Sequence, residues 1–419
     1  MLLKFRLQNH RSLRDEHELS FIASASDGDP RVRKFASLNE GVLPAIAIYG
    51  ANASGKSNVV AALSFLVHSV RHSHRMWDPD GGVPLDPFAL GVEQGASTFE
   101  VDLLLDETRV RYGFSASASR IDSEWLHTWP KGRKQVRFER NGDSIEFARG
   151  LSGGAENKAI HALTRPNSLF LSAAAQNNHV ELRPVFGWFH NVHFRSAVQG
   201  GPLPLSYLLH TLGSRQLRLF GPEIMQDVAP TLLELLKTAD TGIVDIRVED
   251  GDAPISDRLR GSRREARLSF RHRAAKNVSA WLPLEAQSSG TLTLLEIGAR
   301  MFPVLRIGGV LCVDELEASL HPMLASRLLE LFQSPESNPK NAQLLFTTHD
   351  TNLIGTIEAS PLRRDQVWFT EKDQQGASKL YPLTDFKPRK EENLERGYLQ
   401  GRYGAIPFLG GLRTPGSQG

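Results

Sequence analysis

The sequence is poor in cysteine and has no long apolar run. Its only cysteine, Cys312, lies inside a hydrophobic segment, so no disulfide can form within the chain. No apolar run approaches the roughly 20 residues that a membrane helix needs, and Met1–Arg6 lacks the apolar stretch of a signal peptide. We therefore expect a cytoplasmic protein with no membrane partner.

An excess of charge of one sign is also missing. The 49 basic and 47 acidic side chains give a net charge of +2, so a nucleic-acid surface would have to be a local patch. Two basic clusters fit that description. The first comprises Arg258, Arg260, Arg263, Arg264, Arg267, Arg271, Arg273 and Lys276, and the second Lys131, Arg133, Lys134, Arg137 and Arg140. Each could follow a phosphate backbone, bind an acidic partner or form a solvated hairpin. The first has no interleaved aromatic beyond Phe270, which argues against stacking on single strands and leaves nucleic acid only a possible partner.

What the sequence does contain is a complete phosphate-binding loop pattern. The pattern consists of Gly50, Ala51, Asn52, Ala53, Ser54, Gly55, Lys56 and Ser57, and Asn58 follows it. Segment 43–49 predicts a buried strand and segment 58–66 a helix, which is the order that this loop requires. The two glycines let consecutive backbone N–H groups surround an anion at the positive end of the helix. The loop therefore predicts binding of a nucleoside triphosphate.

Two side chains of the loop would complete the phosphate site. Lys56 is placed to reach the β- and γ-phosphates, and the Ser57 hydroxyl is placed to bind Mg²⁺. We accordingly expect ATP and Mg²⁺ as cofactors, with Gly50–Asn58 as the nucleotide-binding segment. A purely structural glycine turn is a poor alternative, because four fixed residue types and both flanking elements agree.

A second motif lies far along the chain, where Val310–Val313 predicts a buried strand that ends in Asp314 and Glu315. Carboxylates at the carboxyl end of such a strand project into the crevice where doubly wound sheets hold ligands. Asp314 would hold Mg²⁺, and Glu315 would orient and polarise the attacking water. Acidic residues in this position can also cap a helix, but the upstream loop favours catalysis.

Segment 343–347 predicts another apolar strand, and His349 follows it. A histidine in this place could hydrogen-bond a γ-phosphate as a switch residue, although a lone histidine is usually structural. Between the two strands, residues 317–322 occupy the position of a D-loop, the segment that crosses to the partner subunit in ABC-type ATPases. The same residues also suit the start of a helix, with Pro322 in its first turn.

A signature motif that contacts the nucleotide of a second subunit has two candidates. Residues 151–154 read LSGG but lie too far before the Asp314 strand, so we interpret them as a decoy. Residues 287–291 read QSSGT, and a helix-compatible stretch, 292–305, leads from them directly to that strand. A hydroxyl and glycine N–H groups at a helix start form an anion site. We therefore predict that Ser288 and Gly290 act in trans in a two-fold dimer.

Together these segments resemble a known group of proteins. The opening FRLQNHRSL at 5–13, the loop GANASGKSN and the run from Asp314 to Pro322 are similar to the RecF/SMC-like and OLD-like AAA family ATPases of the ABC class. The stretches 364–372 and 397–407 are similar to the ATPase subunits of two-gene Rlo and AbiL phage-resistance systems. The resemblance covers essentially the whole chain. Gln287 departs from it, since an acidic residue is expected before the signature serine.

The resemblance implies several further features. It implies a homodimer with composite ATP sites and a separate effector subunit, either a nuclease or a toxin. It places Arg11 on a segment leading toward the adenine and ribose, and Gln176 after an apolar strand, 168–172, as a Q-loop residue that couples Mg²⁺ to subdomain movement. A surface charge for Arg11 and a solvated turn for Gln176 remain alternatives.

The fold class that follows is α/β, a P-loop NTPase of the ABC-ATPase head type. We expect a mainly parallel core sheet, an antiparallel β subdomain from the alternating segments of 98–140, and a helical insert near 203–240 with strand alternation returning at 243–248. The predicted domains are a first ATPase lobe, 1–184, an insert, 185–279, and a second lobe, 280–419, which carries the signature, Asp314 and His349.

Three functions are compatible with this pattern. The first is an ATP hydrolase whose cycle drives the effector of an antiphage defence system. The alternatives are a DNA-repair ATPase of the RecF/SMC type and an ATP-gated scaffold that sequesters a toxin or nuclease with little need for hydrolysis. An intrinsic nuclease is not expected, because residues 350–419 are few for an added domain and their acids form no recognisable metal cluster.

Overall fold

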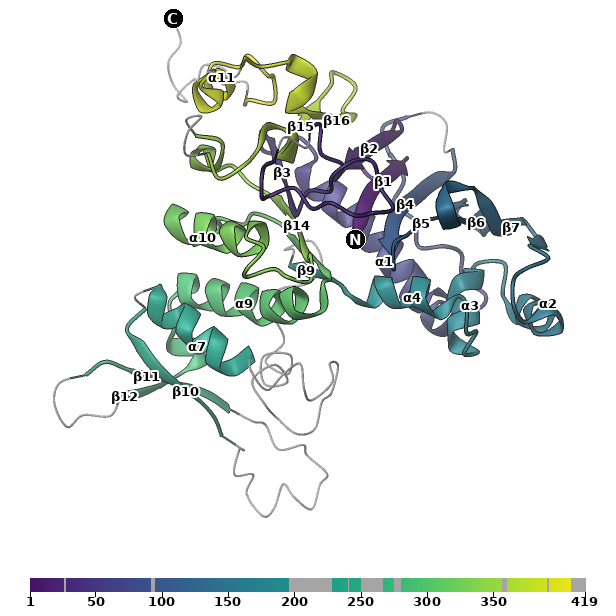
Figure 1. Ribbon diagram of the computed structural model, residues 1–419, viewed down its shortest axis with the longest axis horizontal. Coiled ribbons are helices and arrows are strands. Elements are labelled where there is room, and N and C mark those ends of the chain that lie inside the picture. Colours follow the sequence, from purple (N-terminus) through teal and green to yellow (C-terminus); the bar gives the residue numbers. More distant parts are fainter. Residues whose placement is uncertain are drawn as a thin grey trace, which may run out of the picture.

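The computed structural model describes residues 1–25, 28–91, 95–195, 228–239, 241–249, 267–274, 280–355, 360–389 and 392–407. Within these residues the strands form three sheets, of six, seven and three strands, and helices pack between and beside them (Figure 1). The α/β class is therefore confirmed. In these ranges no helix is long and apolar enough to span a bilayer.

The six-stranded sheet is the core of the molecule, and its strands come from distant parts of the chain. Their order is β16 (Ser378–Pro382), β15 (Val367–Lys372), β3 (Ala45–Gly50), β14 (Gln343–Thr347), β13 (Val310–Val313) and β9 (Val192–Arg195). All neighbours pair in parallel except β15 and β16. Because parallel strands end at the same edge, the segments after β3, β13 and β14 meet there.

Each face of the core sheet has its own hydrophobic core, because alternate residues of a strand point to opposite faces. Ile46 and Ile48 of β3 join one core, and Ala47 and Tyr49 join the other. Helices α1 (Lys56–Met76), α3 (Phe170–Gln176) and α4 (Arg183–His190) contribute to the first core. Helices α9 (Ser289–Ile307), α10 (Pro322–Gln333) and α11 (Leu394–Leu399) contribute to the second.

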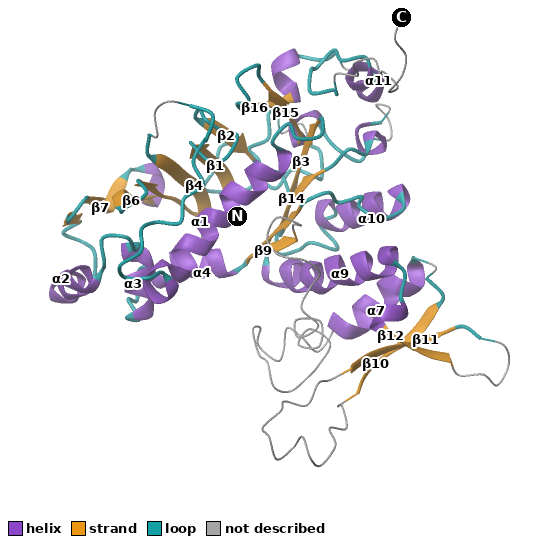
Figure 2. Cartoon of the chain, turned by 180° about the vertical axis from the view of Figure 1, so that it is seen from behind, coloured by secondary structure: helices purple, strands orange, loops and turns teal. Residues whose placement is uncertain are grey.

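A seven-stranded antiparallel sheet packs on the far side of α1 (Figure 2). Its order is β2 (His17–Ser20), β1 (Leu2–Gln8), β4 (Ser97–Leu105), β5 (Thr108–Ala116), β6 (Ile121–Trp129), β7 (Gln135–Asn141) and β8 (Ser144–Phe147), and α2 (Gly154–Leu163) follows it. The buried Glu124 of β6 accepts hydrogen bonds from the Phe170 and Leu171 N–H groups, at 2.6 and 3.0 Å. This carboxylate fixes the first turn of α3 to the sheet.

The third sheet is antiparallel and consists of β10 (Ile243–Glu249), β11 (Arg267–His272) and β12 (Ala280–Pro283). It joins α7 (Val228–Thr238), which packs against α9. Of the predicted insert, residues 196–227, 240, 250–266 and 275–279 lie outside the described residues, and these include Arg258, Arg260, Arg263, Arg264 and Lys276.

Short 3-10 turns occupy Pro130–Gly132, Leu284–Ala286, Thr351–Ile354, Arg364–Gln366 and Leu383–Phe386. One expected element is wrong, since segment 168–172 is not a strand but the approach to α3 and its first turn. The domain boundaries at 184 and 279 stay predictions.

Candidate nucleotide-binding site

The phosphate-binding loop connects β3 to α1, as its pattern predicts. Gly55 has φ of 111°, a conformation that side chains disfavour, and α1 begins at the next residue without a side-chain cap. The first hydrogen bonds of the helix run from the Asn58 and Val59 N–H groups to the Gly55 carbonyl, so the N–H groups of Lys56 and Ser57 precede them and are suited to an anion. The Lys56 ammonium, only 6% exposed, donates to the carbonyls of Gly50 and Ala51 at 2.9 and 3.1 Å. Burial lowers the pKa of Lys56, while the carboxylates of Glu315 and Asp314 oppose that shift.

Ser57 and Asp314 meet although 257 positions separate them in the chain. The Ser57 hydroxyl donates to Asp314 Oδ1 at 2.9 Å. A hydroxyl and a carboxylate are hard oxygen donors of the kind that Mg²⁺ takes alongside phosphates and water. No group of three or more His, Cys, Asp or Glu side chains within the described ranges could hold a metal by itself. The donor set therefore fits a Mg²⁺ that arrives with a nucleotide, not an all-protein metal cage.

The two acidic residues after β13 differ in their surroundings. Asp314 is 7% exposed, whereas Glu315 is exposed and has a left-handed φ of 56° that turns its side chain away from the strand direction. Thr347, at the end of β14, serves both residues. Its hydroxyl donates to Asp314 Oδ1 at 2.7 Å and accepts from the Glu315 N–H at 2.8 Å. Thr347 therefore holds Asp314 and the Glu315 backbone in a fixed relation.

His349 lies in the same neighbourhood, where its ring senses the charges of Lys56, Asp314, Glu315 and Glu317. Desolvation of the ring and the Lys56 charge lower the pKa of His349, so the imidazole is neutral at pH 7. The backbone N–H of His349 donates to Glu317 Oε1 at 2.5 Å, which connects the segment after β14 to the predicted D-loop. The structure thus brings together Lys56, Asp314 and His349.

Side chains from segments outside the loop pattern also hydrogen-bond to the loop region. Ser54 Oγ lies 2.6 Å from Thr370 Oγ1 of β15. Ser12 Oγ accepts from Asn58 Nδ2 and from Ser378 Oγ, each at 2.7 Å. A Cβ on Gly55 would lie 2.3 Å from Ser378 Oγ, so this glycine is required by close packing as well as by its φ.

Arg11 lies beside this contact, since it precedes Ser12. Its Nε donates to Asp86 Oδ2 at 2.7 Å, and its φ is 50°. The segment is therefore adjacent to the phosphate-binding loop, as the adenine–ribose interpretation requires. The role of Arg11 itself stays a prediction.

The predicted signature residues start α9. Ser288 is the N-cap, and its hydroxyl accepts from the Thr291 N–H at 3.1 Å. A Cβ on Gly290 would lie 2.7 Å from the Ser319 carbonyl, so the predicted signature packs against the predicted D-loop of its own chain. No hydrogen bond or ion pair joins Ser288 or Gly290 to the loop residues Lys56 and Ser57, all of which are described.

Arg195 is a residue of this region that the sequence analysis missed. It lies at the end of β9, where its Nε donates to Glu296 of α9 at 3.1 Å and its backbone carbonyl accepts from the Asp314 N–H at 2.8 Å. It therefore connects the signature helix to the strand that carries Asp314. No local pattern marks Arg195, because its partners Glu296 and Asp314 lie 101 and 119 positions away in the chain.

Residues 45–355 match the family described as "AAA domain, putative AbiEii toxin, Type IV TA system". The chain belongs to this family. The expected AAA-type ATP-binding domain is therefore confirmed, whereas the narrower resemblance to Rlo and AbiL subunits stays a prediction.

Three solved structures similar to this chain are heads of SMC proteins. An SMC head bound to the C-terminal winged-helix domain of ScpA has 16% identity, covers 90% of this chain and 97% of its own, and gives a TM-score of 0.45. The SMC head domain of Thermotoga maritima has 14% identity, coverages of 91% and 98%, and a TM-score of 0.40. The Pyrococcus furiosus SMC head bound to the C-terminal domain of ScpA has 15% identity, coverages of 96% and 98%, and a TM-score of 0.43. No curated protein sequence matches the chain.

Gln176 is not brought to the site of this AAA domain. It ends α3, and α3 packs against the far end of α1, where Ser172 Oγ accepts from the His74 N–H and Ser73 Oγ accepts from the Leu169 N–H. That end of α1 is roughly 25 Å along the helix axis from Lys56. The Q-loop and metal roles predicted for Gln176 require that it follow a strand and lie near the phosphate-binding loop, and in the structure it does neither.

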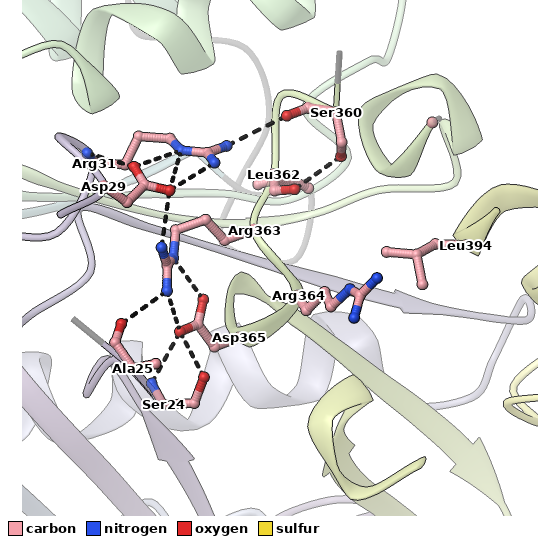
Figure 3. Close-up of a pocket in the computed structure, with 11 residues that line it drawn as sticks. Ser24, Ala25, Asp29, Arg31, Ser360, Leu362, Arg363, Arg364, Asp365 and Leu394 are labelled. Carbon is pink, nitrogen blue, oxygen red and sulfur yellow. Dashed lines mark hydrogen bonds and ion pairs between the residues drawn. The ribbon is translucent and has the colours of Figure 1, made fainter. Parts of the chain in front are cut away.

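One pocket of about 360 Å³ lies elsewhere, at the start of β15 and hence at the opposite edge of the core sheet from the loop (Figure 3). Arg363 donates to both Asp29 and Asp365, and Arg31 also donates to Asp29. Burial opposes both pKa shifts in this cluster. Arg31 and Arg363 nevertheless lower the pKa of Asp29, and the carboxylates of Asp365 and Asp29 raise the pKa of Arg363. The ion pairs join the N-terminal segment to the approach to β15, so we interpret them as structural.

Proposed function

We propose that this protein is a Mg²⁺-dependent ATPase of the ABC type that acts as the ATPase subunit of an antiphage defence system together with a separate effector. The loop amides and Lys56 bind the phosphates, and Ser57 and Asp314 hold Mg²⁺, which supplies charge neutralisation at the γ-phosphate. Glu315 orients the attacking water, and His349 donates a hydrogen bond to the γ-phosphate.

One observation carries the ATPase part of this proposal, the 2.9 Å hydrogen bond between Ser57 and Asp314, whereas the defence role rests on the resemblance of the chain to phage-resistance ATPases. That bond supports a single site built from the phosphate-binding loop and the carboxyl end of β13. The charges of Lys56, Glu315 and Asp314 all act on the pKa of His349, which supports its placement in the same site. Because Glu315 is exposed while Asp314 is buried, the two acids suit different tasks, water activation and metal binding.

The proposal includes a two-fold dimer. Ser288 and Gly290 lie at the start of α9, where a helix N-terminus suits an anion, and they make no hydrogen bond to Lys56 or Ser57 of their own chain. In a dimer with two-fold symmetry, the signature of each copy would face the loop of the other, and both sites would be equivalent.

Mixing two inactive variants tests this geometry. Lys56→Ala removes phosphate binding, and Ser288→Asp keeps an N-cap residue but opposes a γ-phosphate with a negative charge. Each variant alone should be inactive. An equal mixture should regain about a quarter of wild-type turnover, since half of the dimers are mixed and each has one intact site. A mixture as inactive as its components would contradict the composite site.

The defence role is tested separately, with Glu315→Gln in cells that carry the chain and its neighbouring genes. If hydrolysis drives the effector, the variant should bind ATP, lose turnover and lose phage protection. Protection that persists without turnover would contradict a role for hydrolysis and favour the ATP-gated scaffold.

A further inference from the structure

The three-stranded sheet β10–β11–β12 has two unlike faces. Leu268 and Phe270 of β11 are buried in the core that α7 and α9 complete. Because side chains alternate along a strand, Arg267 and Arg271 point to the other face, and both are exposed. Figures 1 and 2 show this sheet at the margin of the molecule, beyond α7 and α9. Its outer face is therefore basic.

The outer face also has an aromatic side chain, which comes from the neighbouring strand. Trp281 of β12 is in register with Arg271 of β11, so both point to the same face. The guanidinium of Arg247 lies 4.4 Å from the centre of the Trp281 ring, and that of Arg271 lies 5.8 Å from it. The indole is half-buried. Trp281 lies outside the arginine-rich segment of the sequence, and it lies next to these arginines because β11 and β12 pair in the sheet.

We propose that this outer face binds single-stranded nucleic acid. Guanidinium groups bind backbone phosphates through paired hydrogen bonds, and the indole and guanidinium planes provide surfaces on which unpaired bases stack. The register places two acidic residues on this face, Asp245, which lies 3.3 Å from Arg271, and Glu249, which is opposite Arg267. The three arginines Arg247, Arg267 and Arg271 outnumber them, so the face keeps an excess of positive charge. The stacking surface is what favours a nucleic acid over an acidic protein.

The inner face of the same sheet is connected to the signature. His272 of β11 donates from Nε2 to Gln287 Oε1 at 2.9 Å, and Gln287 Nε2 donates to the Pro283 carbonyl of β12 at 3.0 Å. Gln287 directly precedes Ser288, the N-cap of α9. A shift of the two strands on binding would therefore reach Ser288, and nucleic acid should change the rate of ATP hydrolysis. This coupling rests on the proposed function, whereas the binding surface does not.

The test is fluorescence anisotropy of a labelled oligothymidylate with the full chain. The wild-type protein should bind it, and the affinity should fall steeply as salt is raised. The double variant Arg267→Glu/Arg271→Glu and the variant Trp281→Leu should each weaken binding by at least about tenfold. The matched control is Arg327→Glu, which reverses an arginine that is 63% exposed on α10, and it should leave the affinity unchanged. Thermal melting of each variant checks that it is folded.

Four results would overturn the inference. The first is a wild-type protein that hydrolyses ATP but does not bind the oligonucleotide, and the second is unchanged binding in the double variant. The third is tighter binding of duplex than of single-stranded DNA. The fourth is a preference for polyglutamate that the same variants abolish. The last result would assign the face to an acidic protein. A protein that binds the oligonucleotide but does not hydrolyse ATP would instead contradict only the proposed function.

Discussion

The Thr347 hydroxyl donates to Asp314 Oδ1 at 2.7 Å, and both groups are buried. Because the same oxygen accepts the Glu315 N–H, one side chain positions the proposed metal ligand and the backbone of the glutamate proposed to orient the attacking water. The end of β14 therefore contributes Thr347 to the proposed site, and His349 follows the same strand.

Replacing Thr347 by valine should lower kcat. Valine keeps the shape but loses both hydrogen bonds, and a bond to a charged group contributes about 1.5–3 kcal/mol. We expect kcat to fall at least about tenfold, while the KM for ATP changes less, since Lys56 and the loop amides still bind the phosphates. Steady-state phosphate release measures both. Thr347→Ser retains the hydroxyl and should restore most of the activity; equal losses in the serine and valine variants would contradict this role.

Replacing Gly290 by alanine should separate binding from turnover. The new Cβ would lie 2.7 Å from the Ser319 carbonyl, which forces the signature and the D-loop apart. ATP binding, measured by calorimetry, should remain, and turnover should fall at least about tenfold.

Gly154 offers the matched control, since it belongs to the LSGG segment that we interpret as a decoy. It starts α2, and a Cβ there would meet no atom within 4 Å. Gly154→Ala should leave ATP turnover within about twofold of wild type. Loss of turnover in Gly154→Ala but not in Gly290→Ala would reverse our assignment of the signature.

Replacing Asp102 by asparagine should destabilise the seven-stranded sheet. The Asp102 side chain is fully buried, and it accepts from Arg111 Nε at 2.7 Å and from Arg109 at 2.8 Å. Removing one charge of such a group costs about 3 kcal/mol of unfolding free energy. The control is Asp143→Asn, since that carboxylate, 77% exposed, pairs with Arg120 at the surface and should contribute less than about 1 kcal/mol. Similar losses in both variants would contradict the prediction.

The effect of Asp102 should depend on pH in a defined direction. Burial acts to raise its pKa, but the hydrogen bonds and charges of Arg111 and Arg109 outweigh burial and lower it below the usual 3.8. Because the folded protein favours the ionised form, this stabilisation is complete above pH 3.8 and is lost as the pH falls through the lower folded value. Denaturant unfolding at pH 7 and near pH 3 should show a smaller gap between wild type and Asp102→Asn at the lower pH.

The sequence predicts the parts of this site that depend on local order. A strand, a glycine loop and a helix determine where Lys56 and Ser57 lie, and a buried strand places Asp314 at the edge where ligands bind. Thr347 and Arg195 could not be predicted in the same way, since their contacts depend on which strands are neighbours in the sheet.

One wrong element of the sequence prediction and one feature that it does not contain have physical causes. The short apolar run 168–172 suits either a strand or a helix, and the Glu124 carboxylate beneath its N–H groups stabilises the helix. Along the chain the basic cluster contains only Phe270, which is buried, whereas Trp281 lies among the arginines because it comes from the next strand of the sheet. Both depend on tertiary contacts.

The central claim is that Ser57 and Asp314 form one Mg²⁺–ATP site with the phosphate-binding loop. The most direct measurement is calorimetric ATP binding with Mg²⁺ and with excess EDTA, for wild type and for Asp314→Asn. We predict that Mg²⁺ tightens ATP binding by wild type at least about tenfold and that the variant loses most of this dependence. Failure of the wild-type protein to bind any adenine nucleotide in the presence of Mg²⁺, or a Mg²⁺ dependence unchanged in Asp314→Asn, would contradict it.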